Sequence, residues 1–202
     1  MKYLNPIKRF CYGWMMIIMT TNPAMATDFD RATFAAGCFW CMEHPFDEID
    51  GVISSTSGYI GGHKDQPSYQ QVSSGSTGHT EAVQILFDPS KVDYEQLLAV
   101  YWRNSDPTTT KRQFCDIGSQ YRPGIFYHND NQQKLAQASK NTLQLHKTFR
   151  EDIVTEITAA TTFWPAEAYH QNYYLKNPLR YKFYRYNCGR DKRLQQLWGA
   201  EQ

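Results

Sequence analysis

Residues 32–36 form a short apolar segment that ends at a glycine, and this pattern is typical of a buried strand. Gly37 permits a tight turn after the strand, and residues 39–50 are compatible with a helix. Cys38 then falls where the helix begins, among amide N–H groups that the helix leaves unpaired. These donors and the helix dipole lower the pKa of a thiol, so we expect Cys38 to be a nucleophile. Cys41 is expected on the same helix face.

The composition limits both the number of domains and the kind of partner. The chain has 202 residues, 41% of them hydrophobic, which is enough for one sizeable core and therefore one domain. Its 21 basic and 20 acidic side chains leave a net charge of +1, so no basic surface is expected to bind nucleic acid. We expect a monomer with no bound cofactor and no metal.

Residues 1–26 have the pattern of a secretory signal peptide. Basic residues come first, and the apolar run of residues 10–19 leads to an A-x-A site that ends at Ala26. The run is shorter than the roughly 20 residues of a spanning helix. We therefore expect cleavage after Ala26 and a periplasmic or extracellular protein with one domain at residues 27–202. An uncleaved membrane anchor is the alternative.

The exported chain contains four cysteines, in a compartment where disulfides persist: Cys38, Cys41, Cys115 and Cys188. Two structural disulfides are one interpretation. A core of this size hardly needs them, however, and a Cys-x-x-Cys loop constrains little of the unfolded chain.

Segments typical of strands and helices alternate along the rest of the chain. Strands are predicted at residues 52–59, 81–87, 124–127 and 153–160, and helices at residues 93–104, 129–147 and 166–175. Asp93 and Gln96 have the spacing of a helix capping box. The tail, residues 177–202, is expected to wrap around the body without forming an element. This pattern predicts an α+β fold in two layers, a mixed β-sheet with helices packed on it.

Seven segments of the chain resemble the A-type peptide methionine sulfoxide reductases, and they occur in the order expected for that family. They are Gly37-Cys38-Phe39-Trp40, Ser57-Gly58-Tyr59-Ile60-Gly61-Gly62, Pro67-Ser68-Tyr69, Ser74-Gly75-Ser76-Thr77-Gly78-His79-Thr80-Glu81, Asp106-Pro107-Thr108, Asp116-Ile117-Gly118-Ser119-Gln120-Tyr121-Arg122 and Ala166-Glu167-Ala168-Tyr169-His170-Gln171. Seven matches in register, over nearly the whole mature chain, make chance a poor explanation.

The resemblance implies an enzyme that reduces methionine S-sulfoxide, in proteins, in peptides or as the free amino acid, and so repairs oxidative damage. Glu81 is implied as the acid that protonates the sulfoxide oxygen, which requires an apolar pocket that keeps it protonated near neutral pH. Tyr69 and Tyr121 are implied to hold that oxygen, and Asp116 to order the site. The implied wall of the pocket for the substrate methyl group consists of Phe39 and Trp40.

The implied reaction leaves Cys38 as a sulfenic acid, which a second thiol must convert to a disulfide. An external thioredoxin-like dithiol then reduces that disulfide. Many family members carry resolving cysteines in a glycine-rich tail, whereas this chain continues from Asn177-Pro178 through a tyrosine-rich stretch to Cys188. Cys188 and Cys41 are the two candidates. We favour Cys188 slightly, because Cys41 is close but would strain the helix start.

Three other residues are expected to have supporting roles. Cys115 is interpreted as a small residue beside the site, although a third redox role is possible. His79 and His170 are interpreted as structural hydrogen-bonding residues, because the implied mechanism needs no imidazole.

Two rival functions use the same cysteines. A thioredoxin-type oxidoreductase would use Cys38 and Cys41 and leave the motifs around Glu81 and Tyr121 without a role. A metal-binding protein would need all four cysteines as tetrahedral zinc ligands, which the isolated positions of two of them disfavour.

Overall fold

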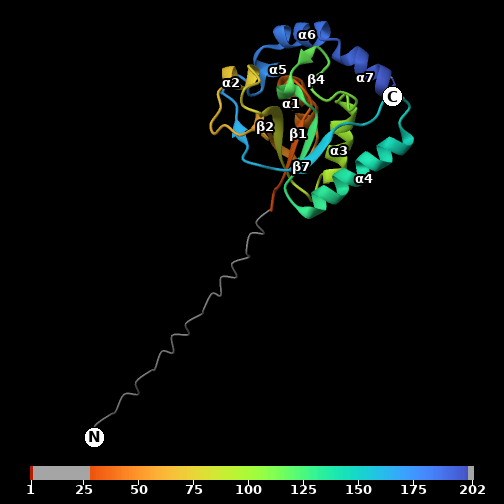
Figure 1. The fold of residues 1–202 in the computed structure, drawn as a ribbon. Helices are drawn as coiled ribbons and strands as arrows, with labels where there is room; N and C mark the ends of the chain where they lie inside the picture. Colours follow the sequence, from red (N-terminus) through yellow and green to blue (C-terminus); the bar gives the residue numbers. More distant parts are fainter. Residues whose placement is uncertain (2–27, 200–202) are drawn as a thin grey trace.

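One six-stranded sheet forms the centre of the fold, which is seen here in a computed structural model that describes Met1 and residues 28–199 (Figure 1). The strands are β1 (Asp30–Ala35), β2 (Val52–Ile60), β3 (Thr80–Phe87), β6 (Gly124–Tyr127), β7 (Glu156–Ala159) and β8 (Trp164–Pro165). Their order across the sheet is β7-β6-β1-β3-β2-β8. Neighbours are antiparallel except for β6 and β7, which are parallel. The mixed sheet is therefore confirmed.

Helices and a small β-ribbon surround this sheet (Figure 1). The helices are α1 (Phe39–Asp47), α2 (Tyr69–Ser73), α3 (Tyr94–Arg103), α4 (Asp130–His146), α5 (Tyr173–Lys176), α6 (Pro178–Asn187) and α7 (Arg190–Trp198). The ribbon consists of β4 (Arg112–Gln113) and β5 (Asp116–Ile117), and a 3-10 turn, η1 (Ser119–Tyr121), follows it. Helices α1, α3 and α4 pack on the sheet, so the predicted α+β class is confirmed.

The main core lies between the sheet and these helices. Phe34 of β1 stacks with Phe46 of α1 and Tyr101 of α3, at ring-centre distances of 5.4 and 5.1 Å. The next residue, Ala35, belongs to a smaller apolar cluster with Ile60, as expected because successive strand residues face opposite sides of a sheet. Burial on both faces of β1 fixes the strand that leads into Gly37 and Cys38.

Two predicted helix starts are confirmed in detail. The Asp93 carboxylate accepts the Gln96 N–H at 2.7 Å, and the Gln96 side chain accepts the Asp93 N–H at 2.9 Å. Asn129 accepts the Gln132 N–H at 2.9 Å at the start of α4. Side chains therefore satisfy donors that the helices leave free.

The prediction of a helix at residues 166–175 is wrong, because helical structure in this range is limited to Tyr173–Lys176. The preceding side chains bond to the sheet instead of supporting a helix. Gln171 pairs with both the N–H and the C=O of Ser57, at 2.9 Å each, and Asn172 has a left-handed conformation with φ of 52°. The β7 strand is also shorter than its predicted range of residues 153–160.

The expectation that the tail forms no element is wrong as well. The tail folds into α6 and α7, and Pro178 occupies the first position of α6, where its missing N–H costs nothing. Gly189, with φ of +67°, separates the two helices. These helices lie along the edge of the molecule near α1 and the β4–β5 ribbon (Figure 1).

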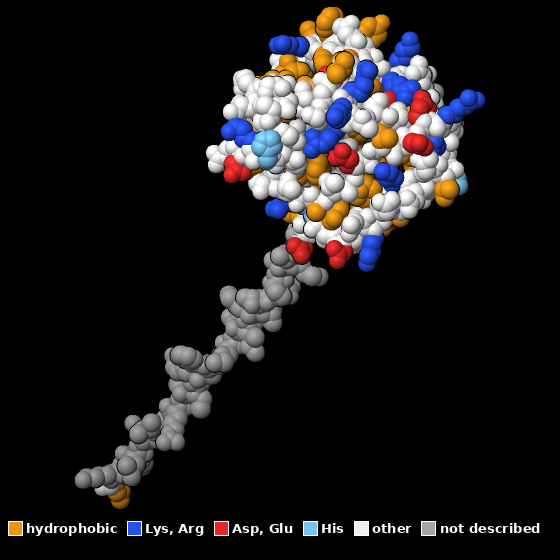
Figure 2. All heavy atoms as spheres, in the orientation of Figure 1, with side chains coloured by type: hydrophobic (Ala, Val, Ile, Leu, Met, Phe, Trp, Pro, Cys, Tyr) orange, Lys and Arg blue, Asp and Glu red, His pale blue; other side chains and the backbone are white. Residues whose placement is uncertain are grey.

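The predicted signal peptide falls on residues outside the described part of the chain. Within the described part, no helix combines the length and the apolar character needed to cross a membrane. On the face shown in Figure 2, basic and acidic side chains are interspersed among uncharged ones.

Candidate active site

The turn before α1 places Cys38 at the start of that helix, as the sequence predicts. Gly37 has φ of +79°, and a Cβ atom there would lie 2.5 Å from the Cβ of Gln113. Glycine is required at this turn for both reasons. Cys38 is the N-cap residue of α1, and its carbonyl accepts the Cys41 N–H at 3.0 Å.

The thiols of Cys38 and Cys41 are both free and buried, with residue exposures of 7% and 1%. Burial raises the pKa of the Cys38 thiol well above its ordinary value, and the neighbouring Cys41 thiol adds to this effect. The neighbouring Cys38 thiol in turn lowers the pKa of Cys41 to about 7. The predicted lowering at Cys38 is therefore wrong for this arrangement, because loss of solvent outweighs the helix start.

Glu81 of β3 points at the same helix start. Glu81 is only 2% exposed, and its carboxyl group accepts a hydrogen bond from the Phe39 N–H at 3.1 Å. Burial raises the pKa of Glu81 to about 8, against the opposing effect of that hydrogen bond. Glu81 is therefore largely protonated at neutral pH, as its predicted role requires.

Two half-buried tyrosines share this site. Tyr69 begins α2, and burial raises its pKa to about 12, with further contributions from the charges of Glu81 and Cys38. The pKa of Tyr121, at the end of η1, is raised by burial and by the same two charges. Both phenols therefore remain protonated and can donate hydrogen bonds beside Glu81 and Cys38.

Asp116 of β5 lies beside the start of α1 and beneath α6. Tyr184 of α6 donates its hydroxyl to the Asp116 carboxylate, at 2.7 and 2.6 Å from the two oxygens. Burial raises the pKa of Asp116, whereas the hydrogen bond from Tyr184 and the charge of Arg190 lower it. Asp116 thus ties the β4–β5 ribbon to α6.

Aromatic side chains surround the Cys38 turn. Trp40 stacks on Tyr173 at 3.7 Å and donates its indole N–H to His170 Nδ1 at 3.0 Å. Phe39 lies 4.9 Å from the His170 ring, and Tyr69 lies 4.4 Å from it on another side. His170 therefore joins the two predicted wall residues to one of the phenols.

The two histidines have the structural roles expected of them. Burial lowers the pKa of His170, which favours the neutral ring that accepts the Trp40 bond. His79 accepts the Gly62 N–H at 3.1 Å and, in the tautomer this requires, donates to the Lys64 carbonyl at 2.7 Å.

Glu167 explains why the segment near His170 forms no helix. Its two carboxylate oxygens accept the Tyr69 N–H and the Tyr59 hydroxyl, both at 2.8 Å. The segment therefore holds α2, and with it Tyr69, against β2.

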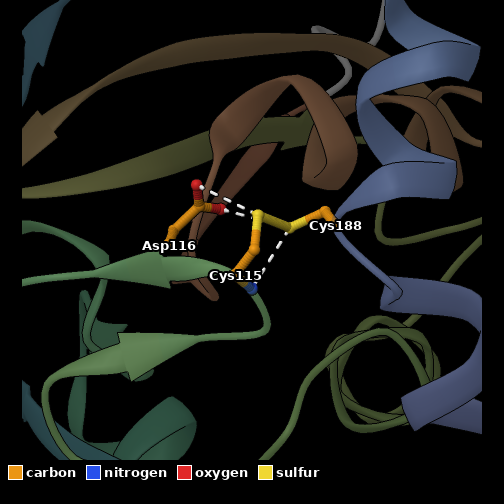
Figure 3. Close-up of side chains that lie close together, drawn as sticks. All are labelled: Cys115, Asp116 and Cys188. Carbon is orange, nitrogen blue, oxygen red and sulfur yellow. Dashed lines mark hydrogen bonds between the residues drawn. A yellow bond between two sulfur atoms is a disulfide. The ribbon is translucent and has the colours of Figure 1, made fainter.

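Cys115 and Cys188 form a disulfide at the edge of the site (Figure 3). Cys115 is exposed and Cys188 is half-buried. The sulfurs of Cys115 and Cys188 lie 3.8 and 4.0 Å from oxygens of Asp116, and the Cys115 N–H donates to the Cys188 sulfur at 3.2 Å. Cys115 is thus more than a small neighbour, and the rival zinc site loses two of its four thiolates.

Tyr184 and Arg190 lie beside the site but were not predicted from the sequence. Both belong to the tail that was expected to form no element, and Arg190 lies buried behind the Cys38 turn. The departure from the family tail pattern and the density of tyrosines were the available signals.

Two free, buried thiols, a protonated carboxylic acid and two phenols on an α+β fold define a cysteine-dependent redox site. The sequence model of the peptide methionine sulfoxide reductase family matches residues 30–202 of this chain. Peptide methionine sulfoxide reductase MsrA of Bacillus licheniformis is 53% identical over 177 residues, which cover 88% of this chain and 98% of that protein. The MsrA of Streptococcus uberis is 54% identical over 152 residues, covering 75% and 90%.

Solved structures give the same result. Mxr1 from Saccharomyces cerevisiae in reduced form has a TM-score of 0.71 at 34% identity, covering 79% of this chain and 91% of that chain. Methionine sulfoxide reductase A of Corynebacterium diphtheriae has a TM-score of 0.67 at 31% identity, covering 77% and 78%. The Mxr1 complex with Trx2 shares the fold, with a TM-score of 0.52 at 24% identity, covering 77% and 91%.

The chain therefore belongs to the peptide methionine sulfoxide reductase family. It is an oxidoreductase that reduces methionine sulfoxide to methionine.

Proposed function

We propose that Cys38 is the nucleophile that reduces methionine S-sulfoxide, with Glu81 as the acid. The observation that carries this assignment is the buried Glu81 carboxyl group, protonated at neutral pH and bonded to the helix start that holds Cys38. A sulfoxide oxygen carries much negative charge, so its departure from sulfur requires a proton.

The first step transfers oxygen from the substrate to Cys38. The Cys38 thiol gives up its proton as its sulfur attacks the sulfoxide sulfur, while Glu81 donates a proton to the oxygen and Tyr69 and Tyr121 donate hydrogen bonds to that oxygen. The oxygen then passes to Cys38 as a hydroxyl group while its bond to the substrate sulfur breaks, and the proton released by Cys38 restores the acid form of Glu81. The substrate gains two electrons and leaves as methionine. Cys38 loses two electrons and becomes a sulfenic acid. Phe39 and Trp40 provide the apolar wall for the substrate methyl group.

We assign the resolving role to Cys41, the second of the two sequence candidates. Cys41 lies one turn along α1 from Cys38, with its N–H bonded to the Cys38 carbonyl at 3.0 Å, and both thiols are free. The lowered pKa of Cys41 favours the attacking thiolate. Cys188, which the sequence analysis favoured slightly, is joined to Cys115 in this structure. The resulting Cys38–Cys41 disulfide is then reduced by an external thioredoxin-like dithiol. The complex of the yeast relative Mxr1 with Trx2 supports a reductant of that kind.

The test is single-turnover reduction of a methyl sulfoxide, followed in the absence of reductant. The wild type and Cys41→Ser are expected to form one equivalent of the methyl sulfide, whereas Cys38→Ser forms none. With dithiothreitol present, the rival thiol–disulfide oxidoreductase predicts no turnover by any of the three proteins. Methyl sulfide formation by Cys38→Ser would overturn the assignment of the nucleophile.

The proposal extends to the cellular setting. The N-terminal pattern supports export and a mature domain at residues 27–202, and the Cys115–Cys188 disulfide is of the kind that persists in an oxidising compartment. The mature domain is proposed to be a monomer. N-terminal sequencing of the exported protein should give a start at Thr27. An intact N-terminus in the membrane fraction would instead support the anchored alternative.

A further inference from the structure

Arg190 is the first residue of α7 and the largest fully buried side chain in the described chain, with 1% exposure. Its guanidinium group donates to the Asn104 carbonyl at 2.6 Å and to the Ala36 carbonyl at 3.3 Å. It also contacts the Met42 sulfur at 2.9 Å and lies 4.3 Å from the centre of the Phe114 ring. None of these partners carries a formal charge.

A buried cation with only neutral partners is costly, so a nearby anion is expected. Among residues 28–199, no carboxylate oxygen lies within 4.0 Å of the Arg190 nitrogens, and its Nε has no hydrogen-bond partner. The neighbouring Arg185 differs, because it pairs with Asp191 at 2.8 Å. Burial lowers the pKa of Arg190, and the strongest opposing influence is the charge of Cys41.

The contacts of Arg190 hold its charge at a fixed place relative to the thiol pair. Ala36 immediately precedes the Gly37 turn, and Met42 immediately follows Cys41. The guanidinium group is therefore fastened to both ends of the segment that contains the two cysteines.

Other titratable groups also face Cys41. They are Cys38 at the helix start, Glu81 of β3, Asp116 of β5, Tyr173 of α5, Tyr181, Tyr184 and Arg185 of α6, and Arg190 of α7. Glu81 and Asp116 disfavour a thiolate at Cys41 when charged, so the cations of α6 and α7 must offset them. Since Arg185 already has an acidic partner, Arg190 is the principal cation available.

We propose that Arg190 is a positioning residue for the disulfide-forming half of the cycle, where its fixed charge holds the negative charge on the Cys41 sulfur. This inference rests on the proposed roles of Cys38 and Cys41. In that step the Cys41 thiolate attacks the Cys38 sulfenic sulfur, an S–S bond forms and the S–O bond breaks. The departing hydroxide combines with the proton that Cys41 gave up and leaves as water, so no external oxidant or reductant is needed.

The test separates the two halves of the cycle in Arg190→Met, Arg190→Lys and the control Arg193→Gln. Arg193 lies on the same helix but pairs with Asp106 and Glu151, and in the described part of the chain it makes no hydrogen bond to residues 36–42. Each protein is mixed with one equivalent of a methyl sulfoxide at pH 6 to 9.5. Methyl sulfide formation reports the first half, and alkylation of free thiols with mass analysis reports the Cys38–Cys41 disulfide.

In Arg190→Met, methyl sulfide should form as in the wild type. Disulfide formation should be about fivefold slower at pH 7, because loss of the cation raises the pKa of Cys41 by roughly one unit or more. When disulfide formation is timed from the release of methyl sulfide, the difference should disappear at pH 9.5, and Arg190→Lys should restore much of the rate at pH 7. Arg193→Gln should match the wild type.

An unchanged pH profile of disulfide formation in Arg190→Met would overturn the inference. Equal loss in Arg190→Lys and Arg190→Met, at every pH, would also overturn it, because that result indicates packing alone. Failure of the proposed function looks different: the wild type would then form no methyl sulfide, or Cys41→Ser would still convert Cys38 into a disulfide.

Discussion

Glu81 shows how burial gives an ordinary side chain a chemical role. On a strand edge exposed to water, its carboxyl group would be ionised at neutral pH and could donate no proton. In this fold it is almost fully enclosed, and its pKa rises to about 8. The acid is thus created by the packing of β3 against the start of α1.

Glu81→Gln should lower the rate of methyl sulfoxide reduction by about 10²-fold to 10⁴-fold, because glutamine cannot transfer a proton. The wild-type rate should also fall as pH rises through about 8, where Glu81 loses its proton, and the variant should lack this decline. Rapid-quench measurement of methyl sulfide between pH 6 and 9.5 tests both points. A variant with wild-type rates would remove Glu81 from the mechanism.

Tyr184 is the second residue whose role depends on its surroundings. Its hydroxyl is bonded to both oxygens of Asp116, whose neighbours include the Cys115–Cys188 disulfide. Loss of the hydroxyl leaves a partly buried carboxylate without its main donor, which costs about 1 to 3 kcal/mol.

Tyr184→Phe should therefore lower kcat/KM for a methyl sulfoxide by roughly tenfold, with little change in the folded structure. Tyr186→Phe is the matched control, because Tyr186 lies two residues away and is 82% exposed. Steady-state kinetics and circular dichroism of the two variants make the comparison. Equal activity of both variants would contradict a role for Tyr184 in ordering the site.

At the scale of elements, the Cys115–Cys188 disulfide ties the C-terminal helices to the β4–β5 ribbon. The bond joins residues 73 apart in the sequence, so it restricts a large loop of the unfolded chain. It also fastens the end of α6 next to Asp116 (Figure 3). Tyr184 of the same helix is bonded to the Asp116 carboxylate. We therefore expect the Cys115–Cys188 disulfide to keep α6 and Asp116 in place beside the site.

The double variant Cys115→Ser/Cys188→Ser should lose about 2 to 4 kcal/mol in the free energy of unfolding, measured by urea denaturation. It should still reduce one equivalent of a methyl sulfoxide and still form the Cys38–Cys41 disulfide. If single-turnover disulfide formation vanished in this variant, the resolving role would have to move from Cys41 to the other pair.

Elements were predictable from the sequence where local signals agree with long-range contacts. The strand, glycine and helix around Cys38 follow local rules, and so does the start of α3 at Asp93. The segment that begins at Ala166 does not follow local rules, because Glu167 and Gln171 bond to residues about a hundred positions away. No local pattern contains that information.

At the scale of the whole molecule, the site combines segments from almost the full length of the described chain. Motif resemblance could indicate Cys38, Glu81 and Asp116, since each lies in a short recognisable segment. It could not indicate Tyr184 or Arg190, because their importance comes from how α6 and α7 pack behind α1. Solvent exclusion at Cys38 also depends on the assembled fold, which explains the error in its expected pKa.

Buried acids should make the stability of the whole fold depend on pH. Burial raises the pKa of Glu81 to about 8 and that of Glu43 to about 7, above the values of the unfolded chain. Their contribution to stability is therefore complete below about pH 4.5 and is lost as pH rises through the folded values. Glu81→Gln should reduce the fall in the free energy of unfolding between pH 5 and 8.5 by on the order of a few kcal/mol. Urea denaturation across this range is the measurement, and an unchanged slope would contradict it.

The most direct test of the central claim is peptide mass spectrometry of the wild-type protein after one equivalent of a methyl sulfoxide, without reductant. The expected result is a new Cys38–Cys41 disulfide, with Cys115–Cys188 unchanged and one equivalent of methyl sulfide released. If methyl sulfide is released while the Cys38 thiol can still be fully alkylated, the Cys38 sulfur is not the atom that takes up the oxygen.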